Sequence, residues 1–153
     1  MLDDVALLLA RTRALDAAHV ATWDVPADPA WVARFRRNVT QRLTEWGLDE
    51  AVFTTELVVS ELVTNAIRHA VPPIQLRLIH DHSLICEVTD SSSTAPHMRR
   101  ARTFDGGGRG LLLVARLSQR WGSRQTAEGK TIWSEQTLPV GLPGDLLGLD
   151  RLD

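Results

Sequence analysis

Apolar residues change their spacing at one proline pair, and this change constrains the fold more than any other feature of the sequence. Before Val71-Pro72-Pro73 they recur every three or four positions, which is the spacing of an amphipathic helix. After the prolines they alternate with polar residues, as in a half-buried strand. Proline has no backbone N–H and breaks a helix, so the helical pattern has to end here. The chain is therefore rich in helices before the break and rich in strands after it, which indicates an α+β fold.

The two predicted helices nearest this break on its N-terminal side have recognisable start and stop signals. Asp28 and Pro29 suit the N-cap and the first position of a helix that continues to Gly47. Asp49 is expected to cap a second helix of about twenty residues that runs to Ala70. The core face of the second helix is predicted to comprise Val52, Phe53, Leu62, Val63, Ala66 and Ile67.

Strands dominate the remainder of the pattern. Predicted strands cover residues 21–25, 74–80, 84–89, 120–125 and 131–137, and a short helix covers 111–118. Asp81-His82-Ser83 and Glu128-Gly129 are typical turn sequences, so each is expected to join two neighbouring strands. Strand pairs joined by short turns favour a mixed, mostly antiparallel sheet. We expect the helices to cover one face of this sheet, in a two-layer α/β sandwich.

Length and composition indicate one domain, over residues 20–138. The 153 residues are 44% apolar, which is enough for a core. Residues 1–19 are predicted to form a helical arm, because the pattern over 2–18 is helical, and residues 139–153 a tail rich in Gly, Pro and Leu. A net charge of −2 gives no field that would attract nucleic acid or anionic lipid.

Cys86 is the only cysteine, which excludes an intrachain disulfide and a cysteine-based zinc cluster. It lies in an apolar run, so we expect it to behave as a buried small hydrophobe. No apolar run approaches the roughly 18 residues of a membrane span. The first residues lack the basic start of a secretory signal. A soluble cytoplasmic protein is therefore expected.

The second predicted helix carries a polar face with an unusual member. Glu61 and Asn65 are four residues apart and share this face, which Arg68 and His69 continue. Asparagine is a poor helix-interior residue unless its side chain has a task, and its amide oxygen is a hard ligand suited to Mg²⁺. The alternative is a solvated face on which Glu61 pairs with Arg68 or a neighbour, and the helical pattern alone favours that alternative.

Three later segments contain residues typical of ligand sites. Asp90 ends a predicted strand, where a carboxylate can accept a hydrogen bond from an adenine amino group or simply begin a turn. The long loop 91–107 leads into a glycine run before the short helix, and such a run can bind an anion or act as a flexible linker. Arg109 within this run adds a charged donor. Thr131 enters the last strand, where it can contact a base or only follow a hairpin.

In their order and spacing these segments resemble the GHKL ATPase family, which includes histidine-kinase catalytic domains, gyrase-type ATPases and anti-sigma serine kinases. The resemblance covers about residues 20–137. Glu61 to Asn65 within ELVTNAIRHA is similar to the N box, and Asp90 is similar to the start of the G1 box. The glycine run followed by LLLVARLSQRWG resembles the G2 box, and GKTIW resembles the last strand of the stand-alone regulators.

The resemblance implies a Bergerat-type site for ATP and Mg²⁺. Asn65 would coordinate Mg²⁺, and Glu61 would act as general base or orient the nucleophile. Asp90 would bind the adenine amino group with help from Thr131. Residues 91–107 would form a lid over the nucleotide. The remaining implied contacts are to the phosphates or the nucleoside, from Arg68, His69, Gly106, Gly107, Gly108, Arg109 and Gly110.

Within the family, a free-standing domain with only about twenty residues before it is similar to the anti-sigma branch. Histidine kinases carry a phosphoacceptor helix pair, and gyrase-type enzymes need a second domain. The resemblance implies a cytoplasmic serine/threonine kinase that phosphorylates a STAS-domain anti-anti-sigma partner and sequesters a sigma factor. Such regulators are often homodimers.

Ser92 departs from the family pattern, because the G1 box usually reads Asp-x-Gly and here reads Asp90-Ser91-Ser92. The glycine normally lets the backbone approach the base, so weaker adenine binding is expected. A second hypothesis therefore stays open, in which the chain is a non-catalytic protein-binding module with weak or no ATP turnover. A plain α+β scaffold without a nucleotide is the third.

Overall fold

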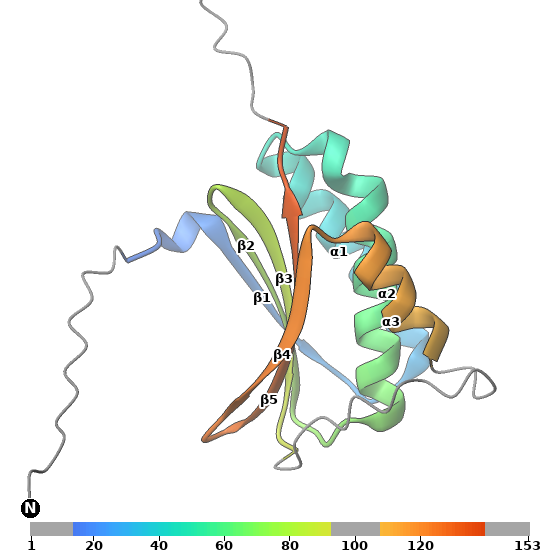
Figure 1. Cartoon of the computed structure of the whole chain (residues 1–153). Helices are drawn as coiled ribbons and strands as arrows, with labels where there is room; N and C mark the ends of the chain where they lie inside the picture. Colours follow the sequence, from blue (N-terminus) through green and yellow to red (C-terminus); the bar gives the residue numbers. More distant parts are fainter. Residues whose placement is uncertain (1–13, 93–107, 140–153) are drawn as a thin grey trace, which may run out of the picture.

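The chain folds into a five-stranded sheet that is covered on one face by three α-helices, as the computed structural model shows for residues 14–92 and 108–139 (Figure 1). The spatial order of the strands is β1-β2-β3-β5-β4, and every neighbouring pair is antiparallel. This arrangement confirms the predicted two-layer α/β sandwich. The strands are β1 (Val20–Val25), β2 (Ile74–His80), β3 (Ser83–Asp90), β4 (Arg120–Thr126) and β5 (Gly129–Thr137).

The helices begin close to the predicted positions. They are α1 (Val32–Glu45), α2 (Val52–His69) and α3 (Gly108–Leu117), with short 3-10 turns η1 (Ala17–His19), η2 (Pro29–Trp31) and η3 (Asp49–Ala51). The carboxylate of Asp28 accepts a hydrogen bond of 2.9 Å from the N–H of Ala30, which confirms its predicted capping role, although the turn that it caps is η2. No helix among the described residues is long and apolar enough to cross a membrane.

Two predicted helix boundaries were wrong. Asp49 does not cap α2: its carboxylate accepts a hydrogen bond of 3.1 Å from the hydroxyl of Thr44, and α2 begins after η3 without a side-chain cap. At the N-terminus, residues 14–16 are not helical, because Asp16 is extended and caps η1 instead. The rest of the predicted arm, residues 1–13, and residues 140–153 of the predicted tail lie outside the described part of the chain.

The core lies between the sheet and the helices. Ile74, Leu76 and Leu78 alternate along β2 as predicted and point toward α1 and α2. The fully buried partners from the other elements include Phe35, Val39 and Leu43 of α1, Val58, Val59, Leu62 and Val63 of α2, Leu84 and Cys86 of β3, and Val114 of α3. Burial, with a smaller contribution from the charge of Glu87, raises the pKa of the Cys86 thiol to about 12.

Phe53 was predicted to belong to the core face of α2, and this prediction was wrong. Its side chain is 73% exposed, whereas Thr55 is fully buried. At about 100° per residue, two positions correspond to about 200° around a helix, so Phe53 points away from the sheet when Thr55 points toward it. The hydroxyl of Thr55 meets the buried amide of Gln136 on β5 instead of an apolar group. The buried face of α2 comprises Thr55, Val58, Val59, Leu62, Val63 and Ala66.

On the opposite face of the sheet, ion pairs join residues of different strands. Glu87 on β3 accepts hydrogen bonds from Arg77 on β2 at 2.6 Å and from Arg124 on β4 at 2.7 Å, so its buried carboxylate is paired on both sides. Trp133 on β5 packs across Gly122 of β4 on this same face. These contacts identify which residues of each strand point away from the helices.

Aromatic rings close one corner of the sandwich. The ring of His80 lies 5.4 Å from that of His19 and 5.5 Å from that of Trp46, measured between centroids. The indole N–H of Trp46 also donates to the carbonyl oxygen of Ala18 at 2.8 Å. Burial lowers the pKa of His80, and the neighbouring His19 lowers it further. The fold therefore favours a neutral His80 imidazole.

Candidate functional site

The end of β3 is fastened to the turn that follows α2. The backbone N–H of Ser91 donates to the carbonyl oxygen of Val71 at 3.0 Å, and its hydroxyl donates to the carbonyl oxygens of Val71 at 3.0 Å and Pro72 at 2.8 Å. These bonds bring Asp90, the last residue of β3, next to the C-terminal end of α2. The segment Val71-Pro72-Pro73, where the spacing of apolar residues changes, therefore also borders the candidate site.

Further toward its N-terminal end, at Glu61, α2 contacts the start of α3. A methyl group added at Gly110 would overlap the Oε2 atom of Glu61, so this carboxylate lies directly against the backbone of α3. Only glycine permits such a close approach. Because α2 contacts α3 through Glu61 and β3 through the turn at Val71, one helix connects two of the predicted site segments.

The other predicted residues of α2 lie between these two contacts. Asn65 is one turn beyond Glu61 and partly exposed, and Arg68 and His69 are exposed in the last turn. Neither Glu61 nor Asn65 forms a hydrogen bond or ion pair with any residue that the structure describes. The alternative interpretation, in which Glu61 pairs with Arg68, is therefore not what the structure shows. The described residues thus leave a carboxylate and a carboxamide on one helix face without a partner.

Asp90 is buried, with 4% of its surface exposed, and its two carboxylate oxygens differ in their surroundings. Oδ1 accepts a hydrogen bond of 2.7 Å from the N–H of Ser92, whereas Oδ2 lies 4.0 Å from the ammonium nitrogen of Lys130. The hydroxyl of Ser92 is buried and has no hydrogen-bond partner within the described ranges. A buried polar atom normally has a partner, so this corner fits a polar group from a ligand.

The predicted role of Thr131 does not agree with its position. Its hydroxyl lies 2.8 Å from that of Thr89, which is its cross-strand partner on the face away from the helices. Side chains alternate between the two faces of a strand, so the neighbouring residue, Lys130, pairs with Asp90 and points to the helix-covered face. Sequence reasoning missed Lys130, and the only signal for it was its place directly after Gly129.

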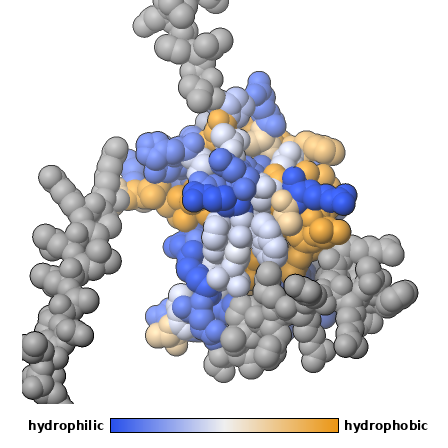
Figure 2. Space-filling view, in the orientation of Figure 1, coloured by the Kyte–Doolittle hydropathy of each residue, from blue (hydrophilic) through white to orange (hydrophobic). Residues whose placement is uncertain are grey.

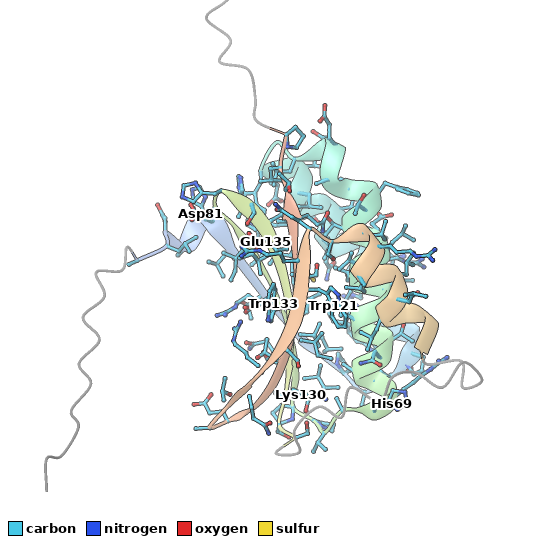
Figure 3. All side chains as sticks on the ribbon, viewed as in Figure 1. His69, Asp81, Trp121, Lys130, Trp133 and Glu135 are labelled. Carbon is cyan, nitrogen blue, oxygen red and sulfur yellow. The ribbon has the colours of Figure 1, made fainter. Side chains whose placement is uncertain are left out.

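Gly129 fixes the start of β5 against Asp90. Its φ of 152° is one that L side chains rarely adopt, and a methyl group there would strike the carbonyl oxygen of Asp90. Lys130, the second residue of β5, is therefore held beside this acid. Figure 3 shows Lys130 and His69 at the same end of the sandwich, one from β5 and one from α2.

The glycine run is described only in part. Gly106 and Gly107 lie outside the described residues, as does the side chain of Arg109, so their predicted phosphate contacts remain predictions. Gly108 begins α3, three residues before the predicted start at Leu111. The first turn of a helix presents free N–H groups that bind anions. The start of α3 beside Glu61 is thus chemically suited to a phosphate.

A separate polar cavity of about 180 Å³ lies between β1 and α1 and is lined by Trp23, Asn38, Gln41, Arg42 and Glu45. It shares no residue with the group around Glu61 and Asp90. Its two charged side chains, Arg42 and Glu45, form an ion pair at 3.2 Å, and among the described residues none that lines it has a buried polar atom without a partner. We therefore place the candidate site at α2, the end of β3 and the start of α3.

A family model described as a histidine kinase-like ATPase domain matches residues 25–134. The matched segment begins at the end of β1, ends within β5, and contains Glu61, Asn65, Asp90 and Gly110. A search of curated proteins found no match.

Proposed function

Because the chain belongs to the histidine kinase-like ATPase family, whose members are ATP-binding domains of the GHKL type, we propose that it is a regulatory protein serine/threonine kinase. Its substrate would be a serine or threonine on a STAS-domain anti-anti-sigma protein, and it would sequester a sigma factor. The observation that carries this proposal is the Glu61 carboxylate, which lies against the first turn of α3 and has no partner among the described residues. The Glu61 carboxylate, which can accept a proton, is then adjacent to the backbone N–H groups of α3, which can bind a phosphate.

The described residues fit ATP. Asp90 offers its Oδ2 oxygen, and Ser92 offers a buried hydroxyl without a partner, so an adenine edge would satisfy polar atoms that the described chain leaves open. The first turn of α3 offers N–H groups to the phosphates. Arg68 and His69 are exposed at the end of α2, and no described contact occupies them.

Asn65 fits Mg²⁺, since its amide is partly exposed and unpaired within the described ranges, one turn from Glu61. Mg²⁺ is usually held by one or two protein oxygens together with water and substrate phosphates, so a single carboxamide is sufficient. When bound, Mg²⁺ neutralises charge on the phosphates.

Glu61 would supply the general base. Its Oε2 atom lies against α3 and is not engaged by a cation of the described chain, so it can accept the proton of a serine hydroxyl. The first turn of α3 would orient the phosphates toward the same point. Phosphoryl transfer needs positioning and charge neutralisation more than covalent chemistry from the protein, and this arrangement supplies both.

The test is transfer of label from Mg·[γ-³²P]ATP to a STAS-domain partner. Asn65→Ala is expected to abolish transfer while the melting temperature changes little, because the amide forms no hydrogen bond with the described residues. Asn38→Ala is the matched control, since Asn38 lies on α1 beside the separate cavity. Normal transfer by Asn65→Ala would contradict the assigned role of this residue.

The second candidate function is a protein-binding module without turnover. The observation that favours it is Lys130, whose ammonium attracts Asp90 and competes with a base for this acid. In that case the chain would bind the STAS partner or the sigma factor with the same affinity in the presence and absence of Mg·ATP, and no label would reach the partner.

A further inference from the structure

Lys130 has an unusual position for the only lysine of the chain. It pairs directly with Asp90 across β3 and β5, on the helix-covered face of the sheet, and only 17% of its side chain is exposed. Its neighbours along this face are Val88 and Ile132, which are apolar. Burial of an ammonium group costs free energy unless the group has a partner. The position of Lys130 beside Asp90, the residue proposed to bind adenine, therefore calls for an explanation.

The distance between the two groups is informative. The ammonium nitrogen lies 4.0 Å from Oδ2 of Asp90, beyond the length of about 2.7–3.2 Å that an N–H···O hydrogen bond requires. The charges attract each other, yet Oδ2 keeps its capacity to accept and the ammonium keeps its capacity to donate. The other oxygen, Oδ1, is already bonded to the N–H of Ser92. The site thus presents one acceptor and one donor side by side.

We propose that Lys130 is a specificity-determining residue that reads the base together with Asp90. Oδ2 of Asp90 accepts a hydrogen bond from the exocyclic amino group of adenine, and the ammonium of Lys130 donates to the ring nitrogen N1 beside that amino group. Adenine carries this donor and this acceptor on adjacent atoms of one edge, which complements the pair in the protein. This inference rests on the proposed ATP binding and adds the residue that recognises N1.

Lys130 also compensates for the serine at position 92. Where backbone would otherwise approach the base, Ser92 places a side chain whose hydroxyl is buried beside Asp90. A long side chain from the opposite strand can reach a base that is held slightly further from this backbone. Base recognition is then shared between β3 and β5.

A merely structural role for Lys130 makes a different prediction. If the ammonium only neutralises the buried Asp90, its removal lowers the stability of the fold and affects all nucleotides equally. If it reads N1, its removal abolishes the preference for nucleotides that possess N1. The ratio of two affinities therefore separates the roles, whatever happens to stability.

The experiment is calorimetric titration of the full chain with Mg·ATP and with Mg·1-deaza-ATP, in which N1 is replaced by C–H. Hydrogen bonds to charged groups predict that wild-type protein binds ATP about ten- to a hundredfold more tightly than 1-deaza-ATP. Lys130→Met is expected to bind both nucleotides with the weaker affinity. Arg124→Met, which removes a cation from the opposite face of the neighbouring strand, should keep the wild-type ratio.

Equal affinities of wild-type protein for ATP and 1-deaza-ATP would overturn the proposal, and this result does not depend on whether a variant folds. A Lys130→Met variant that keeps the wild-type ratio, or that binds ATP more tightly, would also overturn it. If wild-type protein binds neither nucleotide, the proposed ATP-binding function fails first. Purine riboside triphosphate, which lacks the amino group, should lose affinity equally in wild-type and Lys130→Met proteins, because Asp90 reads that group.

Discussion

Substitution of Gly110 by alanine tests the contact that defines the site. The added methyl group would overlap Oε2 of Glu61, and because this atom is the far end of a flexible side chain, the carboxylate rather than the helix is expected to move. Stability should change by less than about 1 kcal/mol, since alanine is the better helix former by a similar amount. A displaced general base should slow phosphoryl transfer by about 10²–10⁴-fold, or roughly 3–5 kcal/mol in activation free energy.

Single-turnover transfer to the STAS partner, together with a melting curve, measures both effects. The matched control is Gly122→Ala, where the added methyl group meets the ring of Trp133 on the face away from the helices and the rate should not change. When Glu61→Gln is already present, adding Gly110→Ala should reduce the transfer rate little further, because both changes act on the same carboxylate. A wild-type rate for Gly110→Ala, or an undiminished further loss in the Glu61→Gln background, would refute the reasoning.

Four side chains with defined surroundings support the remaining predictions. Leu62→Ala should lower the free energy of unfolding by about 2–5 kcal/mol, whereas Phe53→Ala on the exposed side of the same helix should cost under about 1 kcal/mol in a denaturant titration. The lowered pKa of His80 means that the native state binds fewer protons than the unfolded state. The contribution of His80 to the free energy of unfolding should therefore be fully present above about pH 6.5 and should decrease as the pH falls below this value. The His80→Gln variant should lose this pH dependence, whereas the control His82→Gln, at an exposed site, should keep it. Cys86, with its thiol pKa raised to about 12, should resist alkylation at pH 8 until the protein unfolds, as measured by mass spectrometry.

Local patterns in the sequence predicted the five strands and the three α-helices, although not every helix boundary. The proline pair separates α2 from β2, and the alternation of Ile74, Leu76 and Leu78 marks the buried face of β2 as expected. These features depend on backbone chemistry and on periodicity within a few residues, so a single sequence is sufficient to find them. The two-layer architecture followed from the order of helices and short-turn strand pairs.

Errors arose where tertiary geometry decides the outcome. Phe53 is apolar and lies close to a buried stretch, but only the rotation of α2 over the sheet determines that it faces outward. Asp49 suits a helix cap by type, but its carboxylate binds Thr44 instead. The pairing register of β5 with β3 places Lys130, rather than Thr131, opposite Asp90, and the sequence alone does not determine this register.

The sequence also could not reveal the contact between Glu61 and Gly110. These residues are far apart in the chain, and their proximity depends on how α2 and α3 pack. The same holds for the bonds from Ser91 to Val71 and Pro72, which join two segments that the sequence presents separately. Motif order indicated that the segments belong together, and the packing of α2 explains how they meet.

The central claim is that α2, the end of β3 and the start of α3 form one nucleotide site. The most direct measurement is a ¹⁵N NMR titration of the whole chain with a non-hydrolysable Mg·ATP analogue. If they do, the resonances of the Asn65 side-chain amide and of the Asp90 and Gly110 backbone amides should shift together, with one dissociation constant. Shifts confined to the cavity beside Trp23, or shifts of these three groups with different dissociation constants, would contradict it.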